Sequence, residues 1–270
     1  MSAITPPAPA HRTPLAIRRA LFVAAALLGL FLVLVGAFNI VDVASRKTTT
    51  ASASYDGVRT LVIDGASDVR LTGAGEGAAL EVVTRSTEGL RGPDSSVERG
   101  AGGELRLSSS CPNLFTSQCG VDYTISVPSG TVVRAEADAG DVTAERLRTS
   151  EPLVLDTSAG DVEASDVTAP SITLSSSAGD IEARGLSADS VRLESSAGDV
   201  VASLATPAEE LFADSSAGDV ELLVPNEIYR VDATSSAGDV DAGALRTDPS
   251  AQRSITAHSS AGDVLVAAQP

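Results

Sequence analysis

The stretch Ser195-Ser196-Ala197-Gly198-Asp199-Val200 decides the fold, because the chain repeats this phrase, with small changes, seven times. From glycine to glycine, successive copies are 20, 19, 19, 20, 20 and 24 residues apart. A nearly constant period of this size is typical of proteins that stack one structural unit on the next. We interpret the Gly-Asp pair of each copy as a structural corner, and the pairs are Gly140, Asp141, Gly160, Asp161, Gly179, Asp180, Gly198, Asp199, Gly218, Asp219, Gly238, Asp239, Gly262 and Asp263.

Apolar and polar residues alternate on both sides of each glycine. Around Gly179, the apolar positions are Ile172 and Leu174 before the corner and Ile181 and Ala183 after it. This alternation predicts two short strands that meet at the glycine, each with one buried and one exposed face. Hairpins of an antiparallel sandwich would alternate in the same way, but the same columns are apolar in every copy, which favours coils stacked in register. We therefore predict an all-β fold, a right-handed parallel β-helix or β-roll (a β-solenoid) with one coil per 19–20 residues.

The corner residues have chemical reasons to be there. Glycine tolerates positive φ, which a tight corner often requires, and aspartate can bond its side chain to nearby backbone N–H groups. Three residues before each glycine stands a small, mostly hydroxylic residue such as Ser195, which faces inward by parity. We expect these stacked hydroxyls to bond one another. The second corner of each coil, for example residues 184–189, is looser in sequence.

The N-terminal region is predicted to anchor the chain in a membrane. Residues 1–19 contain four prolines and are expected to form a disordered cytoplasmic tail. Residues 20–41 are predicted to form a transmembrane helix, since the uncharged run from Ala20 to Phe38 would be about 28 Å long as a helix. Basic residues just before this run favour a cytoplasmic N-terminus, with the bulk of the chain extracytoplasmic. The alternative is a signal peptide cleaved near Val35-Gly36-Ala37.

The remainder divides into three parts. Residues 42–54 are interpreted as a linker, 55–134 as N-terminal β coils and a cap, and 135–270 as the repeat β-solenoid. Gly65-Ala66-Ser67-Asp68-Val69 looks like a degraded copy of the phrase. Because little sequence follows the seventh phrase, we expect the last coil to expose a strand edge, through which the protein could self-associate. The strands expected before residue 134 are Val58–Ile63, Val69–Thr72, Leu80–Thr84, Leu105–Ser108 and Tyr123–Val127.

The amino-acid composition of the chain favours some classes of protein and argues against others. With 43% apolar but only 3% aromatic residues, the chain suits a thin solenoid core better than a globular enzyme with a deep pocket. The net charge of −17 argues against nucleic acid as a partner. The two cysteines, Cys111 and Cys119, are expected to form a local disulfide, because the chain is predicted to lie outside the cytoplasm. A redox or metal-binding role is the alternative, and the lack of a C-x-x-C motif and of a nearby histidine argues against it.

The chemical inventory predicts neither an enzyme nor a cofactor or metal site. His11 falls in the predicted tail, and His258 stands in an outward column in which no catalytic partner recurs. The corner aspartates form a ladder whose repulsion, about 0.9 kcal/mol per neighbouring pair in water, the fold can tolerate without a metal. Weak, diffuse cation binding by this ladder is the alternative. A glycan-active β-helix enzyme is an alternative function, which would need a cluster of acids or bases on adjacent coils.

Two segments and the repeats between them carry a family resemblance. They are Tyr123-Thr-Ile-Ser-Val-Pro128-Ser-Gly-Thr131 and its echo from Leu223-Val224-Pro225-Asn226 to Val240. In these features the chain, from about Tyr55 onward, resembles the bacterial putative-adhesin family of β-strand-repeat proteins, a domain of unknown function. The resemblance implies a β-solenoid outside a membrane, often in envelope or stress-response settings, and it transfers no catalytic or binding residues.

The sequence therefore predicts a protein anchored in the cytoplasmic (inner) membrane that acts by binding. The hypothesis is an adhesin-like, scaffolding or stress-related module whose partner is an envelope protein or glycan. The alternative is a self-assembling structural solenoid, resembling the bactofilin-like cytoskeletal proteins.

Overall fold

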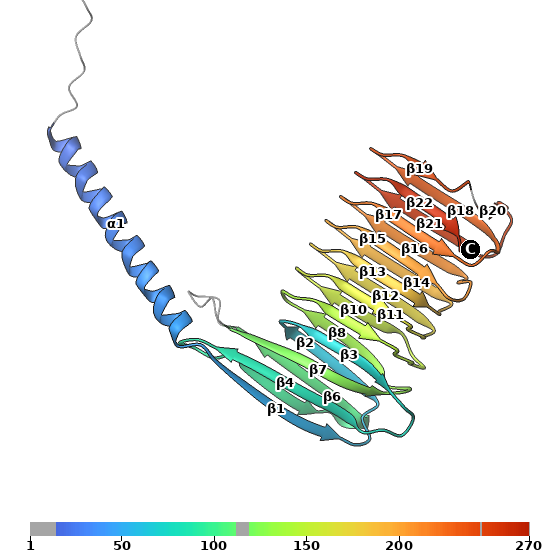
Figure 1. The fold of residues 1–270 in the computed structure, drawn as a ribbon, viewed down its shortest axis with the longest axis horizontal. Coiled ribbons are helices and arrows are strands. Elements are labelled where there is room, and N and C mark those ends of the chain that lie inside the picture. The colour runs from blue at the N-terminus through green and yellow to red at the C-terminus, as the bar shows by residue number, and fades with distance from the viewer. Residues whose placement is uncertain (1–14, 112–118, 244, 270) are drawn as a thin grey trace, which may run out of the picture.

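The computed structural model describes residues 15–111, 119–243 and 245–269. A long helix, α1 (Leu15–Ala44), leads into two sheets of 11 strands each, which enclose one continuous apolar core (Figure 1). Sheet A contains, in spatial order, β1 (Lys47–Tyr55), β4 (Leu80–Glu88), β7 (Gly120–Pro128), β3 (Val69–Ala74), β9 (Val142–Glu145), β11 (Val162–Ser165), β13 (Ile181–Leu186), β15 (Val200–Leu204), β17 (Val220–Val224), β22 (Val264–Ala268) and β19 (Val240–Asp241). Sheet B contains β20 (Arg246–Thr247), β18 (Ile228–Ser235), β21 (Ser254–Ser259), β16 (Glu210–Ser215), β14 (Ser190–Ser195), β12 (Ser171–Ser176), β10 (Leu153–Thr157), β8 (Val132–Ala137), β2 (Thr60–Ala66), β6 (Glu104–Ser110) and β5 (Asp94–Arg99). A short 3-10 helix, η1 (Ala101–Gly103), precedes β6.

Successive coils stack in parallel and in register. From β8 onward, each coil gives one strand to sheet B and the next to sheet A. Between β12 and β14, Ile172 lies opposite Val191 and Leu174 opposite Leu193, and all four side chains are buried. Burying one such side chain is worth roughly 1.5–3 kcal/mol, so coils that are unstable alone gain stability as a stack. The predicted all-β solenoid is thus confirmed.

Both ends of the stack depart from the order of the sequence. The coil β2–β3 lies between β6–β7 and β8–β9, and the coil β21–β22 lies between β16–β17 and β18–β19. At the second of these ends, the inner coil has the larger inward-facing residues: Ile255 and Val266 are buried there, where the outer coil has Val231 and Ala242. Placing the more apolar coil inside removes more apolar surface from water.

This arrangement overturns the expectation that the last coil exposes a strand edge. The edge of sheet A is β19, which belongs to the sixth phrase, while β22 is paired on both sides. Val240 on β19 is 45% exposed, whereas its partner Val264 on β22 is 1% exposed. The outermost coil at this end is therefore β18–β19; its strand β19 is an edge, while β18 pairs at its start with the short strand β20.

The predicted linker over 42–54 is wrong from Lys47 onward. Residues Lys47–Tyr55 form β1, which pairs antiparallel with β4 along its whole length. Every residue of β1 except Tyr55 is exposed, so the strand buries neither face and is held mainly by its backbone bonds. The helix also begins earlier than predicted, at Leu15, which shortens the predicted tail; residues 1–14 lie outside the described part of the chain.

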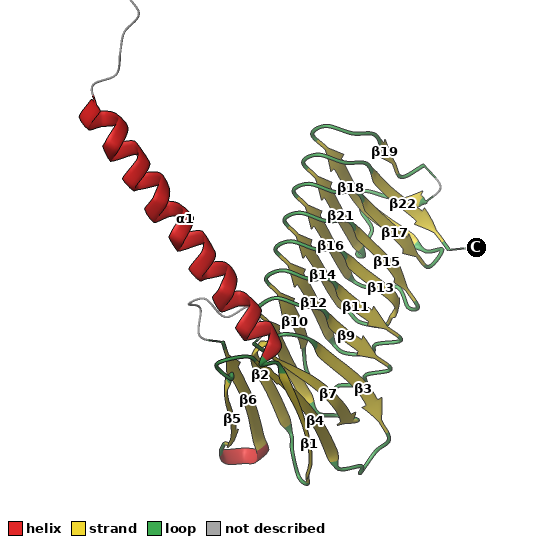
Figure 2. Cartoon of the chain, turned by 60° about the vertical axis from the view of Figure 1, so that its left-hand side comes forward, coloured by secondary structure: helices red, strands yellow, loops and turns green. Residues whose placement is uncertain are grey.

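Antiparallel strands cover the end of the stack nearest α1. The five strands expected before residue 134 are present as β2, β3, β4, β6 and β7. Of these, β4 runs antiparallel to β7, and the unpredicted strand β5 runs antiparallel to β6 (Figure 2). The parallel coils are thus ended by antiparallel strands, and the outermost of these, β1 and β5, are almost wholly exposed, as suits the end of a stack.

Candidate functional site

The seven Gly-Asp corners lie in one column along the edge of the stack and are joined by their side chains. In each step, the backbone N–H of one aspartate donates to the carboxylate of the aspartate in the adjacent coil, on the side nearer the N-terminal cap. For example, the Asp199 N–H donates to Asp180 Oδ1 at 2.8 Å. Asp68 accepts from the Asp141 N–H in the same way, which confirms the interpretation of residues 65–69 as a degraded copy. In spatial order the ladder is Asp68, Asp141, Asp161, Asp180, Asp199, Asp219, Asp263 and Asp239.

The hydroxyl column faces inward, but its members do not bond one another as expected. Ser195 Oγ instead donates to the carbonyl oxygen of Gly179, in the preceding coil, at 2.9 Å. The carbonyl is available because the corner turns the chain from one sheet to the other and leaves this oxygen outside both strand ladders. The same bond to the preceding glycine is made by Thr157, Ser176, Ser215, Ser259 and Ser235.

The corner requires glycine for a different reason from the predicted one. Only Gly198, Gly218 and Gly262 of the seven have a positive φ, of 159°, 157° and 156°, which is close to extended backbone. Glycine is required because the corners touch: a Cβ on Gly179 would overlap the carbonyl group of Gly160. The predicted reason for these glycines, positive φ at a tight corner, is therefore wrong, and the close approach of two backbones explains them.

The disulfide occupies the corresponding corner of an earlier coil. Cys111 and Cys119 follow β6 and precede β7, where later coils have the Gly-Asp phrase, and their sulfur atoms are 2.03 Å apart. Residues 112–118 of this loop lie outside the described part of the chain.

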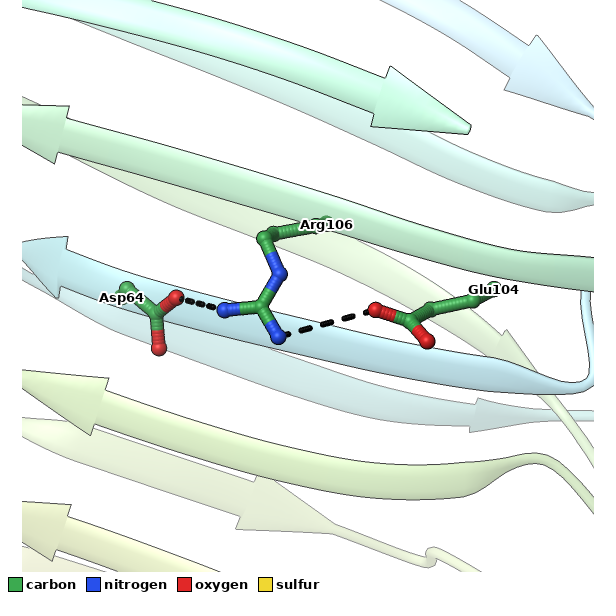
Figure 3. A network of polar contacts seen from close by, with 3 residues as sticks. All are labelled: Asp64, Glu104 and Arg106. Carbon is green, nitrogen blue, oxygen red and sulfur yellow. Dashed lines mark hydrogen bonds and ion pairs between the residues drawn. The ribbon is translucent and has the colours of Figure 1, made fainter. Parts of the chain in front are cut away.

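A polar groove of about 560 Å³ lies on the outer side of sheet B, near the capped end. Its lining combines serine hydroxyls with carboxylates, and Arg106 reaches one of these, Asp64, at 2.5 Å (Figure 3). The same guanidinium approaches Glu104 at 3.6 Å on its other side, so its charge is shared between two acids. The groove offers hydrogen-bond acceptors and hydroxyls, which suit polar ligands. Its lining residues are Asp64, Gly65, Asp94, Ser95, Ser96, Ser108, Ser109, Ser110, Glu136 and Asp138.

A smaller hollow of about 190 Å³ lies over sheet A at the head of the aspartate ladder. Burial raises the pKa of Asp122 there, and the nearby carboxylate of Asp68 raises it further, while Arg85 opposes the change. Two like charges in a partly desolvated hollow disfavour ionisation of the more buried one. This carboxyl therefore holds its proton to a higher pH than an ordinary aspartate does.

The described residues form no evident catalytic cluster. His258 lies on the outer side of sheet B, where Nδ1 is 3.0 Å from the Thr234 hydroxyl and Nε2 is 3.5 Å from that of Ser260. Within the described ranges, no group of three or more His, Cys, Asp or Glu side chains is placed to hold a metal ion. His11 lies outside those ranges.

Comparison with known proteins gives a family and distant structural neighbours. The family model described as Toastrack DUF4097 matches residues 113–267. Among solved structures, a putative adhesin from Parabacteroides distasonis ATCC 8503 is 16% identical, with 82% of this chain and 97% of that chain covered and a TM-score of 0.44. A putative adhesin from Bacteroides fragilis NCTC 9343 is 15% identical, with coverages of 83% and 97% and a TM-score of 0.41. A putative cell adhesion protein from Clostridium sporogenes ATCC 15579 is 10% identical, with coverages of 83% and 100% and a TM-score of 0.35. No curated protein matches the chain.

Proposed function

The chain belongs to the Toastrack DUF4097 family, and from that premise we propose that it is a membrane-anchored, extracytoplasmic β-solenoid that acts by binding. Its role is non-catalytic and adhesin-like: it scaffolds the cell envelope or takes part in an envelope stress response. The partner is an envelope protein or glycan.

The main observation in support of a membrane anchor is the exposed apolar surface of α1. Its segment Phe22–Ala44 contains an 18-residue window with a mean hydropathy of 2.5, and no residue of that window is buried against the rest of the described chain. In water, such a helix would leave a continuous apolar surface exposed. Insertion into a bilayer transfers this surface from water to the hydrocarbon core. A signal sequence has the same features, so the test must distinguish a retained helix from a cleaved one.

Thiol labelling in intact cells tests the anchor and its direction together. Ser2→Cys and Val97→Cys each add one reactive thiol, since the native cysteines are paired and Val97 is 51% exposed. A membrane-impermeant maleimide should label Val97→Cys in intact cells and Ser2→Cys only after permeabilisation. Labelling with the opposite pattern would reverse the topology, and loss of the Ser2→Cys thiol from the mature chain would show cleavage.

A binding role is supported by the geometry of the stack. Its parallel coils form a continuous stack that presents the outer faces of two sheets, and the polar groove adds a surface with many hydrogen-bond acceptors. Proximity labelling from the solenoid in intact cells should mark a reproducible set of envelope components. The matched control is the same solenoid released by a cleavable signal sequence, and an identical set from both would count against an anchored binding role.

A second candidate function, self-assembly, is favoured by the outermost coil β18–β19, in which β19 is an edge strand and β20 covers only the start of β18. Val231 and Ala233 are only partly buried there, and β19 has no partner on its outer side. Light scattering of the full chain in detergent should show concentration-dependent association, which Val240→Lys on the outer strand should abolish. A species that stays monomeric at high concentration would remove this candidate.

A further inference from the structure

The helix is joined to the solenoid by a direct contact in its last turn. Asp42 is fully buried, and its Oδ1 accepts the backbone N–H of Leu90 at 2.8 Å. The loop between β4 and β5 comes so close that a Cβ on Gly89 would overlap this carboxylate. With β1 beginning at Lys47, three residues after the helix ends, little chain is left to act as a hinge.

The loop held by Asp42 has the chemistry of a membrane interface. Leu90 is 43% exposed, and Arg91 beside it is exposed as well. Arg46 and Lys47, just after the helix, are also exposed, and the Lys47 ammonium lies 3.8 Å from the Glu88 carboxylate, so Arg46 and Arg91 are the main cations of this surface. An apolar side chain among basic ones suits the boundary of a bilayer, where the apolar group enters the acyl region and the cations contact lipid phosphates.

The directions of α1 and of the solenoid restrict how the protein can be oriented in a bilayer. From their junction, α1 and the solenoid both extend toward the same side, diverging from each other in both views (Figures 1 and 2). A bilayer with α1 along its normal would overlap the charged solenoid, which is costly. The 23-residue span is about 34 Å long as a helix, more than the roughly 30 Å of the hydrocarbon core, and tilting accommodates the excess.

We propose that the solenoid lies along the extracytoplasmic surface of the bilayer instead of standing upright on it. In this arrangement α1 is tilted, and Leu90 and Arg91 contact the phospholipid headgroup region beside it. The proposal rests on the membrane anchor proposed above, and it identifies the lipid surface as a partner of the solenoid.

Fluorescence on the full chain in lipid nanodiscs tests the proposal. The discs contain mainly phosphatidylcholine with a minor share of phosphatidylglycerol, and each variant carries one environment-sensitive dye. On Leu90→Cys the dye should be quenched by headgroup-level nitroxide lipids. On Gln252→Cys, an exposed site between β20 and β21 at the far end of the stack, it should transfer energy efficiently to headgroup acceptors. On Phe31→Cys, within the span, it should be quenched by nitroxides deep in the acyl chains.

The outcomes separate the two proposals. Deep quenching at Phe31→Cys without headgroup quenching at Leu90→Cys, or with little transfer from Gln252→Cys, would leave the anchor in place and overturn the surface-lying arrangement. No deep quenching at Phe31→Cys would overturn the anchor and this inference with it.

Matched variants test the Asp42 contact itself. In the Gln252→Cys background, Gly89→Ala should release the stack and remove most of the energy transfer, while Gly75→Ala, where a Cβ meets nothing within 4 Å, should preserve it. Asp42→Ala, which removes the acceptor without adding bulk, should reproduce the loss. Circular dichroism checks that the solenoid stays folded in each variant. Transfer that is unchanged in both Gly89→Ala and Asp42→Ala would contradict the contact's role.

Discussion

Replacing a single corner glycine by alanine should loosen the stack, and Gly179→Ala is the most informative case. Its added methyl group would overlap the carbonyl of Gly160, which is backbone and cannot rotate away. The two coils must therefore move apart at this corner. The movement stretches two bonds between the coils, from the Asp180 N–H to Asp161 Oδ1 and from Ser176 Oγ to the Gly160 carbonyl, both at 2.8 Å.

The expected loss follows from these contacts. Overpacking costs about 1–3 kcal/mol. Two weakened hydrogen bonds add about 0.5–1.5 kcal/mol each. Alanine also reduces the conformational freedom of the unfolded chain, which returns about 0.4–1 kcal/mol. A net loss near 3 kcal/mol would lower Tm by about 6–12 °C for a domain of this size.

Thermal unfolding followed by circular dichroism, on the full chain in detergent, measures this shift. Gly75→Ala is the matched control, since its Cβ would meet open space, and its Tm should equal or slightly exceed that of the parent chain. If Gly179→Ala unfolded at the same temperature as Gly75→Ala, the corners would not be in backbone contact and the reasoning would be refuted.

Substitutions at three further positions test the side chains of the corner and of the small hollow. Asp180→Ala leaves the Asp199 N–H without its acceptor and should cost about 0.5–1 kcal/mol in chemical denaturation, whereas Asp180→Asn keeps an acceptor oxygen and should cost less; equal losses would contradict the ladder. Ser195→Ala removes a buried donor to the preceding glycine carbonyl and should cost about 1 kcal/mol, while Ser195→Thr, the residue type found in this column at position 157, should be nearly neutral. Because the fold raises the pKa of Asp122, the folded state binds its proton more tightly than the unfolded state, and stability falls as pH rises through that raised pKa. Asp122→Asn should therefore raise Tm at neutral pH, with the gain vanishing below the ordinary aspartate pKa; a gain independent of pH would point to another cause.

The core of the solenoid could be predicted because its signal is periodic. Residues such as Ile172 and Val191 recur in the same column of each coil, and burial of one strand face produces that recurrence. Strand β1 could not be predicted in this way. In Lys47–Tyr55 both faces are exposed, so no apolar alternation marks the strand, and its partner β4 is distant in sequence.

The order of the end coils was also beyond prediction, for a related reason. Every coil carries the same columns, so each is a suitable neighbour for any other. Only the size of the inward residues, as between Ile255 and Val231, favours one order over another, and this preference is visible only once two coils compete for one position. The junction at Asp42 was missed because a single carboxylate beyond an apolar run gives no indication of which distant loop it contacts.

The coils that lie out of sequence order affect how the solenoid can assemble during synthesis. A solenoid in sequence order can grow one coil at a time as the chain emerges. Here β18–β19 emerges before β21–β22, yet it rests upon that later coil and has no finished surface to join when it first appears. Near the other end, β2–β3 must likewise wait for β6–β7. Neither end of the stack can therefore be completed until residues that follow later in the chain have been synthesised. A chain truncated before Ser254 would lack the internal coil β21–β22, so the coil β18–β19 would have no neighbour of its native kind.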